Sequence, residues 1–143
     1  MKGEVHAVCL SEAKGTAKHE VDEARLVADH GMAGDAHAGK WHRQVSLLAT
    51  EKVDRFRETG IDVENGAFGE NILVSGIDLA ALPVGTILIV GDAQLEVTQI
   101  GKTCHTRCRI YDTVGDCIMP REGIFARVLK GGAIRKGDPV HVS

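Results

Sequence analysis

The sequence predicts a mainly β domain, a closed or nearly closed β-barrel with about two short helices. Along several short segments apolar residues recur with a period of two, which is typical of half-buried strands. The chain has 17 glycines among its 143 residues, and glycine suits tight turns and barrel corners. Roughly seven short strands would leave exposed sheet edges unless the sheet closed on itself. We therefore expect one domain spanning residues 1–143.

The first strand is expected over 4–10, with Val5, Ala7 and Cys9 on one face. The clearest hairpin joins 86–90 to 93–100 through Gly91-Asp92, because glycine accepts the positive φ of a two-residue turn. Further strands are expected over 20–28, 44–48, 71–74 and 140–142.

Two segments read as helices. The first runs over 51–58, with Thr50 as its cap, Gly60 beyond its end, and Val53 and Phe56 facing the core. The second is expected over 121–130 and ends before Gly131. Its apolar stripe would consist of Ile124, Phe125, Val128 and Leu129.

Composition excludes several classes of protein. A net charge of −3, a pI near 6.1 and 3% aromatic residues do not suit a nucleic-acid binder. The N-terminal residues lack the apolar core of a signal peptide, and no apolar run is long enough to span a membrane. We expect a cytoplasmic protein with reduced thiols, no nucleic-acid partner and no membrane contact.

Three of the four cysteines cluster after the predicted hairpin, at positions 104, 108 and 117. Arg107 and Arg109 flank Cys108, and neighbouring cations lower the pKa of a thiol and make its sulfur a better nucleophile or metal ligand. The alternative is that some of these cysteines are small buried apolar residues, above all Cys117. Cys9 is expected in the core.

A zinc site is the competing interpretation of this cluster. The C-x₃-C-x₈-C spacing fits neither a zinc ribbon nor a c-type haem attachment site. A Cys₃His site that includes His105 stays open as an alternative.

Two glycine-containing loops complete the candidate site. In 29–48, Lys40 and Arg43 could supply charge to an anion, while His30, His37 and His42 are either metal ligands or incidental residues of a solvated loop. In 64–72, Asn71 can donate and accept hydrogen bonds to a heterocycle, or simply cap the following strand.

Taken together and in order, these segments resemble the MOSC family, the domain named for the C-terminal part of molybdenum-cofactor sulfurases. The likeness covers nearly the whole chain and is greatest to small stand-alone bacterial members. It is carried by residues 34–39, 43–48, 68–72 and 82–85, by the Cys-x₂-Arg-Cys run that ends at Cys108, and by 137–140.

The resemblance implies a β-barrel-like fold and a key cysteine that carries sulfur or ligates molybdenum. The family pattern falls on Cys108, with one residue inserted before Ile110, and Cys104 is its rival. The implied cofactor is the molybdenum cofactor, molybdopterin. Its phosphate suits Lys40 and Arg43, and its pterin edge suits Gln44 or Asn71. His37, Arg107 and Arg109 complete the expected cofactor-binding set.

The resemblance also implies partners. The chain has no desulfurase-like domain, so pyridoxal phosphate is expected only on a partner. Sulfur would come from a cysteine desulfurase or a molybdopterin-processing enzyme and go to an acceptor molybdoenzyme. One alternative is a small molybdoenzyme that reduces N-hydroxylated substrates with a separate electron donor. Another is a non-enzymatic module with a structural zinc.

Overall fold

The computed structural model describes residues 2–14, 16–101 and 118–143, with the side chain of Pro120 left out. In the described chain the helical elements are α1 (Thr50–Arg57), the 3-10 turn η1 (Leu79–Ala81) and the single turn α3 (Met119–Glu122). The strands are β1 (Lys2–Leu10), β2 (His19–Val21), β3 (Glu23–Val27), β4 (Gly31–Met32), β5 (Val45–Ala49), β6 (Ile72–Ser75), β7 (Ile87–Val90), β8 (Ala93–Ile100), β9 (Ile124–Lys130), β10 (Gly132–Arg135) and β11 (Pro139–Val142).

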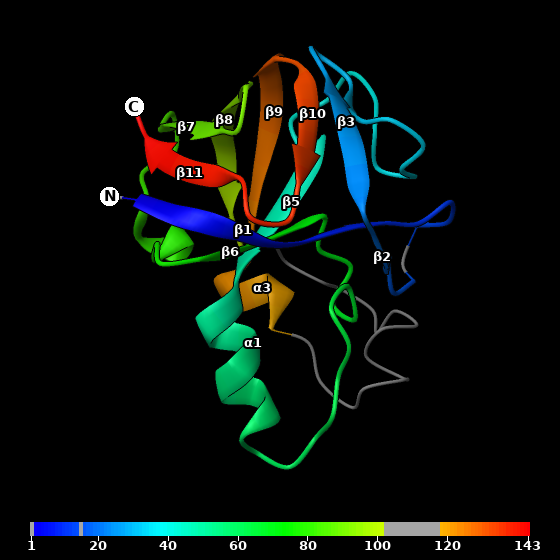
Figure 1. Ribbon diagram of the computed structural model, residues 1–143, viewed down its shortest axis with the longest axis vertical. Coiled ribbons are helices and arrows are strands. Elements are labelled where there is room, and N and C mark those ends of the chain that lie inside the picture. Colours follow the sequence, from blue (N-terminus) through cyan, green and yellow to red (C-terminus); the bar gives the residue numbers. More distant parts are fainter. Residues whose placement is uncertain (1, 15, 102–117) are drawn as a thin grey trace.

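Seven of these strands form a closed barrel, in the order β11-β7-β8-β9-β5-β6-β1. The barrel closes where β1 pairs antiparallel with β11, with Lys2 opposite His141 (Figure 1). β2 extends the sheet beside β1, and β10, β3 and β4 form a separate three-stranded sheet. The prediction of a mainly β, closed barrel is confirmed, because closure leaves these seven strands without a free edge.

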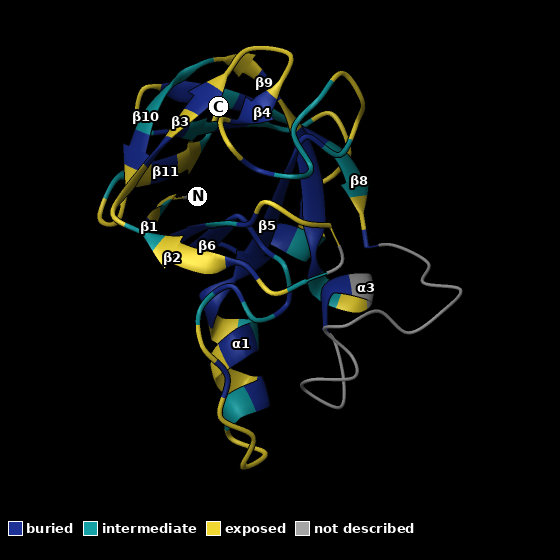
Figure 2. Cartoon of the chain, turned by 90° about the vertical axis from the view of Figure 1, so that its right-hand side faces the viewer, coloured by how far each residue is buried: buried dark blue, intermediate teal, exposed yellow. Residues whose placement is uncertain are grey.

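The apolar side chains form two clusters. The larger fills the barrel and includes Val5, Leu47, Ile72 and Leu95, all fully buried. The smaller lies under α1, which stands at the same end of the barrel as α3 and has one buried and one exposed side (Figure 2). β5 and β6 contribute side chains to both clusters.

Several local predictions hold. The β7–β8 hairpin turns at Gly91-Asp92, with Gly91 at a φ of 56°. Helix α1 falls on the expected residues and buries Val53 and Phe56. The cap prediction was wrong, since Ala49 is the N-cap residue and Thr50 lies inside the helix, where its buried Oγ1 has no hydrogen-bond partner among the described residues.

The predicted helix over 121–130 was also wrong. After the short turn α3, residues Ile124–Lys130 form strand β9, which pairs with both β8 and β5. Its first three residues are all buried, whereas Arg127, Leu129 and Lys130 are exposed. Where a strand is buried on both faces, its apolar residues form a continuous run instead of a period of two, and periodicity alone cannot distinguish such a run from a buried helix.

The predicted strand over 20–28 divides into β2 and β3, which belong to different sheets. In the part of the chain that the structure describes, no helix has the length and apolar character needed to cross a bilayer.

Candidate functional site

A small cavity lies where the loops before β5 and β6 meet α3 and β9. It has a volume of about 30 Å³. It is lined by Thr16, His37, Arg43, Ser46, Phe68, Gly69, Met119 and Phe125. From the sequence we expect one cleft lined by 34–46, 65–72 and 101–109, and the first two of these segments do meet in this cavity. The third, 101–109, lies outside the described residues apart from Gly101, whose N–H donates to the carbonyl of Gly123 at 2.7 Å.

Arg43 provides the positive charge of this cavity. Its Nε donates to Gln99 Oε1 at 3.1 Å, and its guanidinium lies 5.3 Å from the Phe125 ring centroid and 5.9 Å from that of Trp41. These contacts fix the half-buried side chain through one nitrogen and two ring faces. Among the described residues its two Nη atoms have no hydrogen-bond partner, so their N–H groups can serve a ligand.

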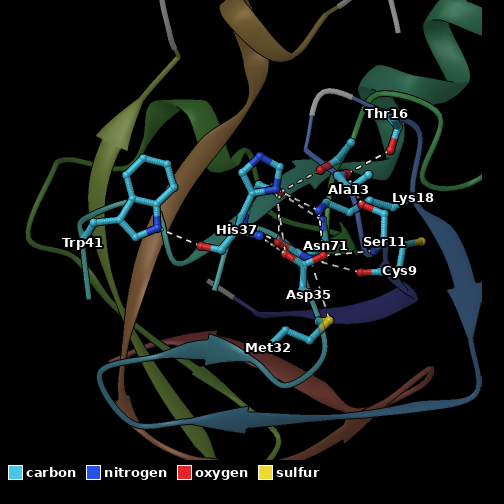
Figure 3. Close-up of polar contacts among 12 residues, drawn as sticks. Cys9, Ser11, Ala13, Thr16, Lys18, Met32, Asp35, His37, Trp41 and Asn71 are labelled. Atoms are coloured by element: carbon cyan, nitrogen blue, oxygen red, sulfur yellow. Dashed lines mark hydrogen bonds and ion pairs between the residues drawn. The ribbon is translucent and has the colours of Figure 1, made fainter. Parts of the chain in front are cut away.

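His37 lies beside a buried ion pair that the sequence did not reveal. Lys18 Nζ is 2.7 Å from Asp35 Oδ1 and 3.0 Å from His37 Nδ1 (Figure 3). Both partners of the pair are fully buried. Burial alone would raise the pKa of Asp35, but the hydrogen bond and charge of Lys18 outweigh it and lower that pKa below its ordinary value.

Asp35 also organises the backbone around the cavity. Its Oδ1 accepts the Ser11 N–H, and its Oδ2 accepts the His37 N–H, each at 3.1 Å. The Ala36 N–H donates to the Ser11 carbonyl at 2.8 Å. One buried carboxylate thus ties the loop after β1 to the loop that carries His37.

Asn71 is fully buried and lies next to the cavity instead of lining it. Its Oδ1 accepts hydrogen bonds from the Ser46 N–H at 3.0 Å and the Ser46 hydroxyl at 3.1 Å. Its Nδ2 donates to the Cys9 carbonyl at 3.1 Å and contacts the Met32 sulfur at 3.7 Å (Figure 3). The side-chain amide joins three segments and positions Ser46 at the cavity wall.

Gln44 and Lys40 do not line the cavity either. Gln44 is fully buried, accepts the Val128 N–H at 2.9 Å and donates to Asp29 Oδ1 at 3.1 Å. Lys40 is exposed on the loop between His37 and Arg43. Of the five expected cofactor-binding residues that the structure describes, His37 and Arg43 share the cavity.

Glu70 is a second buried acid that sequence reasoning did not single out. Its two carboxylate oxygens accept the Gly66 N–H at 2.9 Å and the Phe68 N–H at 3.1 Å. Burial raises the pKa of Glu70 to about 7, although these backbone hydrogen bonds favour the charged form. Gly66 has a φ of 91°, and a Cβ there would collide with the Lys18 carbonyl oxygen. This loop places Phe68 and Gly69 in the cavity wall.

The structure describes one of the four cysteines, Cys9. Cys104, Cys108 and Cys117, with Arg107 and Arg109, lie outside the described residues. Cys9 is buried in the core as expected, and burial, followed by the charge of Glu70, raises the pKa of its thiol. Within the described ranges, no group of three His, Cys, Asp or Glu side chains is placed to hold a metal ion.

Comparisons with known proteins agree with this architecture. YuaD from Bacillus subtilis superposes with a TM-score of 0.81 at 20% identity, over 99% of this chain and 96% of its own. YiiM from Geobacillus stearothermophilus has a TM-score of 0.75 at 19% identity, over 99% of this chain and 75% of its own. YiiM from Escherichia coli has a TM-score of 0.69 at 20% identity, over 100% of this chain and 70% of its own. At these identities the likeness establishes the fold.

A search of curated sequences found no match. The family model of the MOSC domain, in contrast, matches residues 34–141, which include every residue of the cavity except Thr16. The chain therefore belongs to the MOSC domain family, which is associated with proteins of the molybdenum cofactor.

Proposed function

We propose that this MOSC domain binds the molybdenum cofactor through its anionic end and carries sulfur on Cys108 for delivery to a molybdoenzyme. The observation that carries the proposal is the cavity that joins Arg43 and His37. Its wall includes Met119, two residues after the segment that contains Cys104 and Cys108. A cationic donor and a reactive thiol are the two groups that such a carrier needs.

The described residues suit one part of the cofactor. A cavity of about 30 Å³ holds a group of a few atoms, such as phosphate oxygens, and is too small for a pterin. The guanidinium of Arg43 can form charge-assisted hydrogen bonds with phosphate, and Ser46 lines the same space. When bound, the cofactor supplies a molybdenum centre to which a thiolate can be a ligand.

The sulfur-transfer step needs no external oxidant or reductant. The Cys108 thiolate attacks the terminal sulfur of a persulfide on a partner cysteine desulfurase. The partner's S–S bond breaks as the new S–S bond forms on Cys108, and the partner's cysteine leaves as a thiolate. Arg107 and Arg109 would stabilise both the attacking thiolate and the persulfide anion.

The experiment is persulfide mapping. The protein is incubated with a pyridoxal phosphate-dependent cysteine desulfurase and L-cysteine, and each cysteine is then identified by alkylation and mass spectrometry. We expect the persulfide on Cys108, its loss in Cys108→Ser, and its retention in Cys117→Ser as the matched control. Form A fluorescence of the oxidised pterin should show cofactor in protein purified from a molybdenum-competent host.

Other outcomes would contradict the proposal. If Cys104 is loaded with persulfide and this loading survives Cys108→Ser, the proposal names the wrong cysteine. Reduction of a hydroxylaminopurine with an artificial electron donor, without persulfide loading, would favour the alternative that the protein is a small molybdoenzyme that reduces N-hydroxylated substrates. If the wild type binds zinc and the removal of any one of Cys104, Cys108 or Cys117 unfolds the protein, the alternative of a non-enzymatic module with a structural zinc is favoured.

A further inference from the structure

We propose that Gln99 is a positioning residue of the cavity: its neutral side-chain amide orients the guanidinium of Arg43 and leaves the positive charge uncompensated for an oxyanion. Gln99 acts through Arg43 and does not line the cavity itself. The orientation of Arg43 follows from the fold alone, whereas the identity of the oxyanion as the phosphate of a cofactor rests on the proposed function.

A β-bulge directs the side chain of Gln99 toward Arg43. In the β8–β9 ladder Val97 lies opposite Ala126, and both belong to the barrel core. A strict period of two would direct Gln99 into the core as well. The register shifts between Val97 and Gln99, however, and places Gln99 opposite Phe125. Opposite residues share a face of the sheet, and the Phe125 ring centroid is 5.3 Å from the Arg43 guanidinium. The bulge therefore brings Gln99 to the face on which Arg43 lies.

The partners of Gln99 determine which way its amide points. Its Oε1 accepts the Arg43 Nε–H at 3.1 Å, and an oxygen has to face Arg43 because a guanidinium only donates. Its Nε2 donates to the Gly101 carbonyl at 2.8 Å, and a carbonyl only accepts. Oε1 also lies 2.8 Å from His42 Nε2, which is then the donor. All three contacts require the same orientation of the amide.

Arg43 differs in its partner from other arginines of this chain. Arg57, Arg127 and Arg135 each form an ion pair with a carboxylate. Arg43, in contrast, forms no ion pair with a carboxylate in the described part of the chain, and its Nε is held by the uncharged oxygen of Gln99. The two Nη atoms therefore keep both their N–H groups and an uncompensated charge for a ligand.

The neutral partner determines which class of ligand the cavity suits. A carboxylate in place of the amide would hold the guanidinium equally well, but it would also pair with its charge, and an oxyanion would have to compete with that pair. The amide orients Arg43 without this competition. The arrangement therefore suits a negatively charged oxygen, such as that of a phosphate.

The experiment uses the full chain without cofactor and has two readouts. ¹H–¹⁵N spectra of the arginine side chains give the rate at which the Arg43 Nε–H exchanges with water, with the signal assigned by its loss in Arg43→Lys. Titration of inorganic phosphate into the same sample gives the affinity for the anion. In the wild type we expect the Arg43 Nε–H to exchange more slowly than that of the exposed Arg25.

Two substitutions of Gln99 separate orientation from charge. Gln99→Glu should keep the slow exchange and weaken phosphate binding by at least about 10-fold, because the carboxylate neutralises Arg43. Gln99→Met should make the exchange fast and weaken phosphate binding by about 3- to 10-fold, because the acceptor is lost. Gln94→Met, at a half-buried position near the other end of β8, is the matched control and should change neither readout.

Three results would overturn the inference: wild-type Arg43 exchange as fast as that of Arg25, unchanged exchange in a folded Gln99→Met protein, or phosphate affinity in Gln99→Glu equal to that of the wild type. If Gln99→Met does not fold, the wild type and Gln99→Glu decide. A wild type that binds no phosphate would overturn the anion site of the proposed function, whereas the Nε–H exchange decides the orienting role of Gln99 separately.

Discussion

Lys18 Nζ lies 2.7 Å from Asp35 Oδ1, and neither side chain has any solvent exposure. This contact joins the segment before β2 to the loop before β5, and through Asp35 it also holds the backbone N–H groups of Ser11 and His37. The pair therefore supports the wall of the cavity and the ring of His37 with the same few atoms.

Breaking this pair should destabilise the fold strongly. We expect Lys18→Met to lower the free energy of unfolding by about 3–5 kcal/mol, because it leaves the Asp35 carboxylate buried and unpaired. Lys18→Met/Asp35→Asn should recover part of that loss. Urea unfolding followed by circular dichroism measures both.

The exposed pair of Arg135 and Glu23, with N···O at 2.8 Å, is the matched control. Arg135→Met should lower the free energy of unfolding by less than about 1 kcal/mol. Equal losses for Lys18→Met and Arg135→Met would contradict the role of burial.

The Lys18–Asp35 pair should also make stability depend on pH. The folded-state pKa of Asp35 lies below its unfolded value, so the stabilisation is present above the unfolded pKa and is lost as the pH falls through the folded-state pKa.

Asn71→Ala should reduce stability before it affects any ligand. The substitution leaves the Ser46 N–H and the Cys9 carbonyl without their partner in a buried environment, at a cost of about 2–4 kcal/mol. Asn65→Ala, which removes exposed or half-buried hydrogen bonds to Glu20 and Arg57, should cost less than about 1 kcal/mol. Thermal or urea unfolding compares the two variants. A stable Asn71→Ala protein would leave the amide free for a role in ligand binding.

Glu70 should make the stability of the protein depend on pH. Burial raises its pKa to about 7 from an ordinary value of 4.5, so its contribution is complete below pH 4.5 and is lost as the pH rises through about 7. Relative to Glu70→Gln, the wild type should lose about 3 kcal/mol of unfolding free energy between pH 4.5 and 8. Glu64→Gln, at an exposed position of the same loop, is the control. Parallel pH curves for wild type and Glu70→Gln would show that Glu70 is not protonated in this range.

The parts of the fold that could be predicted are those with local causes. The β7–β8 hairpin follows from one glycine at a two-residue turn, and α1 follows from the spacing of Val53 and Phe56. Strand β9 could not be predicted, because Ile124–Ala126 are all buried and this apolar run hides the alternation that appears only in the second half of the strand. Pairing with distant strands, not local sequence, decides its conformation.

In the candidate site, too, residues with a local sequence signal could be predicted, and residues defined by long-range contacts could not. The motifs around Arg43 and His37 are recognisable in the sequence, and the structure places both residues in one cavity. Lys18 could not be found, because its partner lies 17 residues away on another segment and nothing in its neighbourhood signals burial. The sequence shows that Asn71 is polar, but only the fold shows that its side chain forms hydrogen bonds with Ser46 and Cys9.

The most direct test of the account is the affinity of the purified protein for the molybdenum cofactor, measured for wild type, Arg43→Ala and Arg135→Ala. The account predicts that Arg43→Ala weakens binding by about 10- to 150-fold, equivalent to about 1.5–3 kcal/mol for a charge-assisted hydrogen bond, while Arg135→Ala binds like wild type. Circular dichroism should show both variants folded. Unchanged affinity in a folded Arg43→Ala protein would contradict the assignment of this cavity to the anionic end of the cofactor.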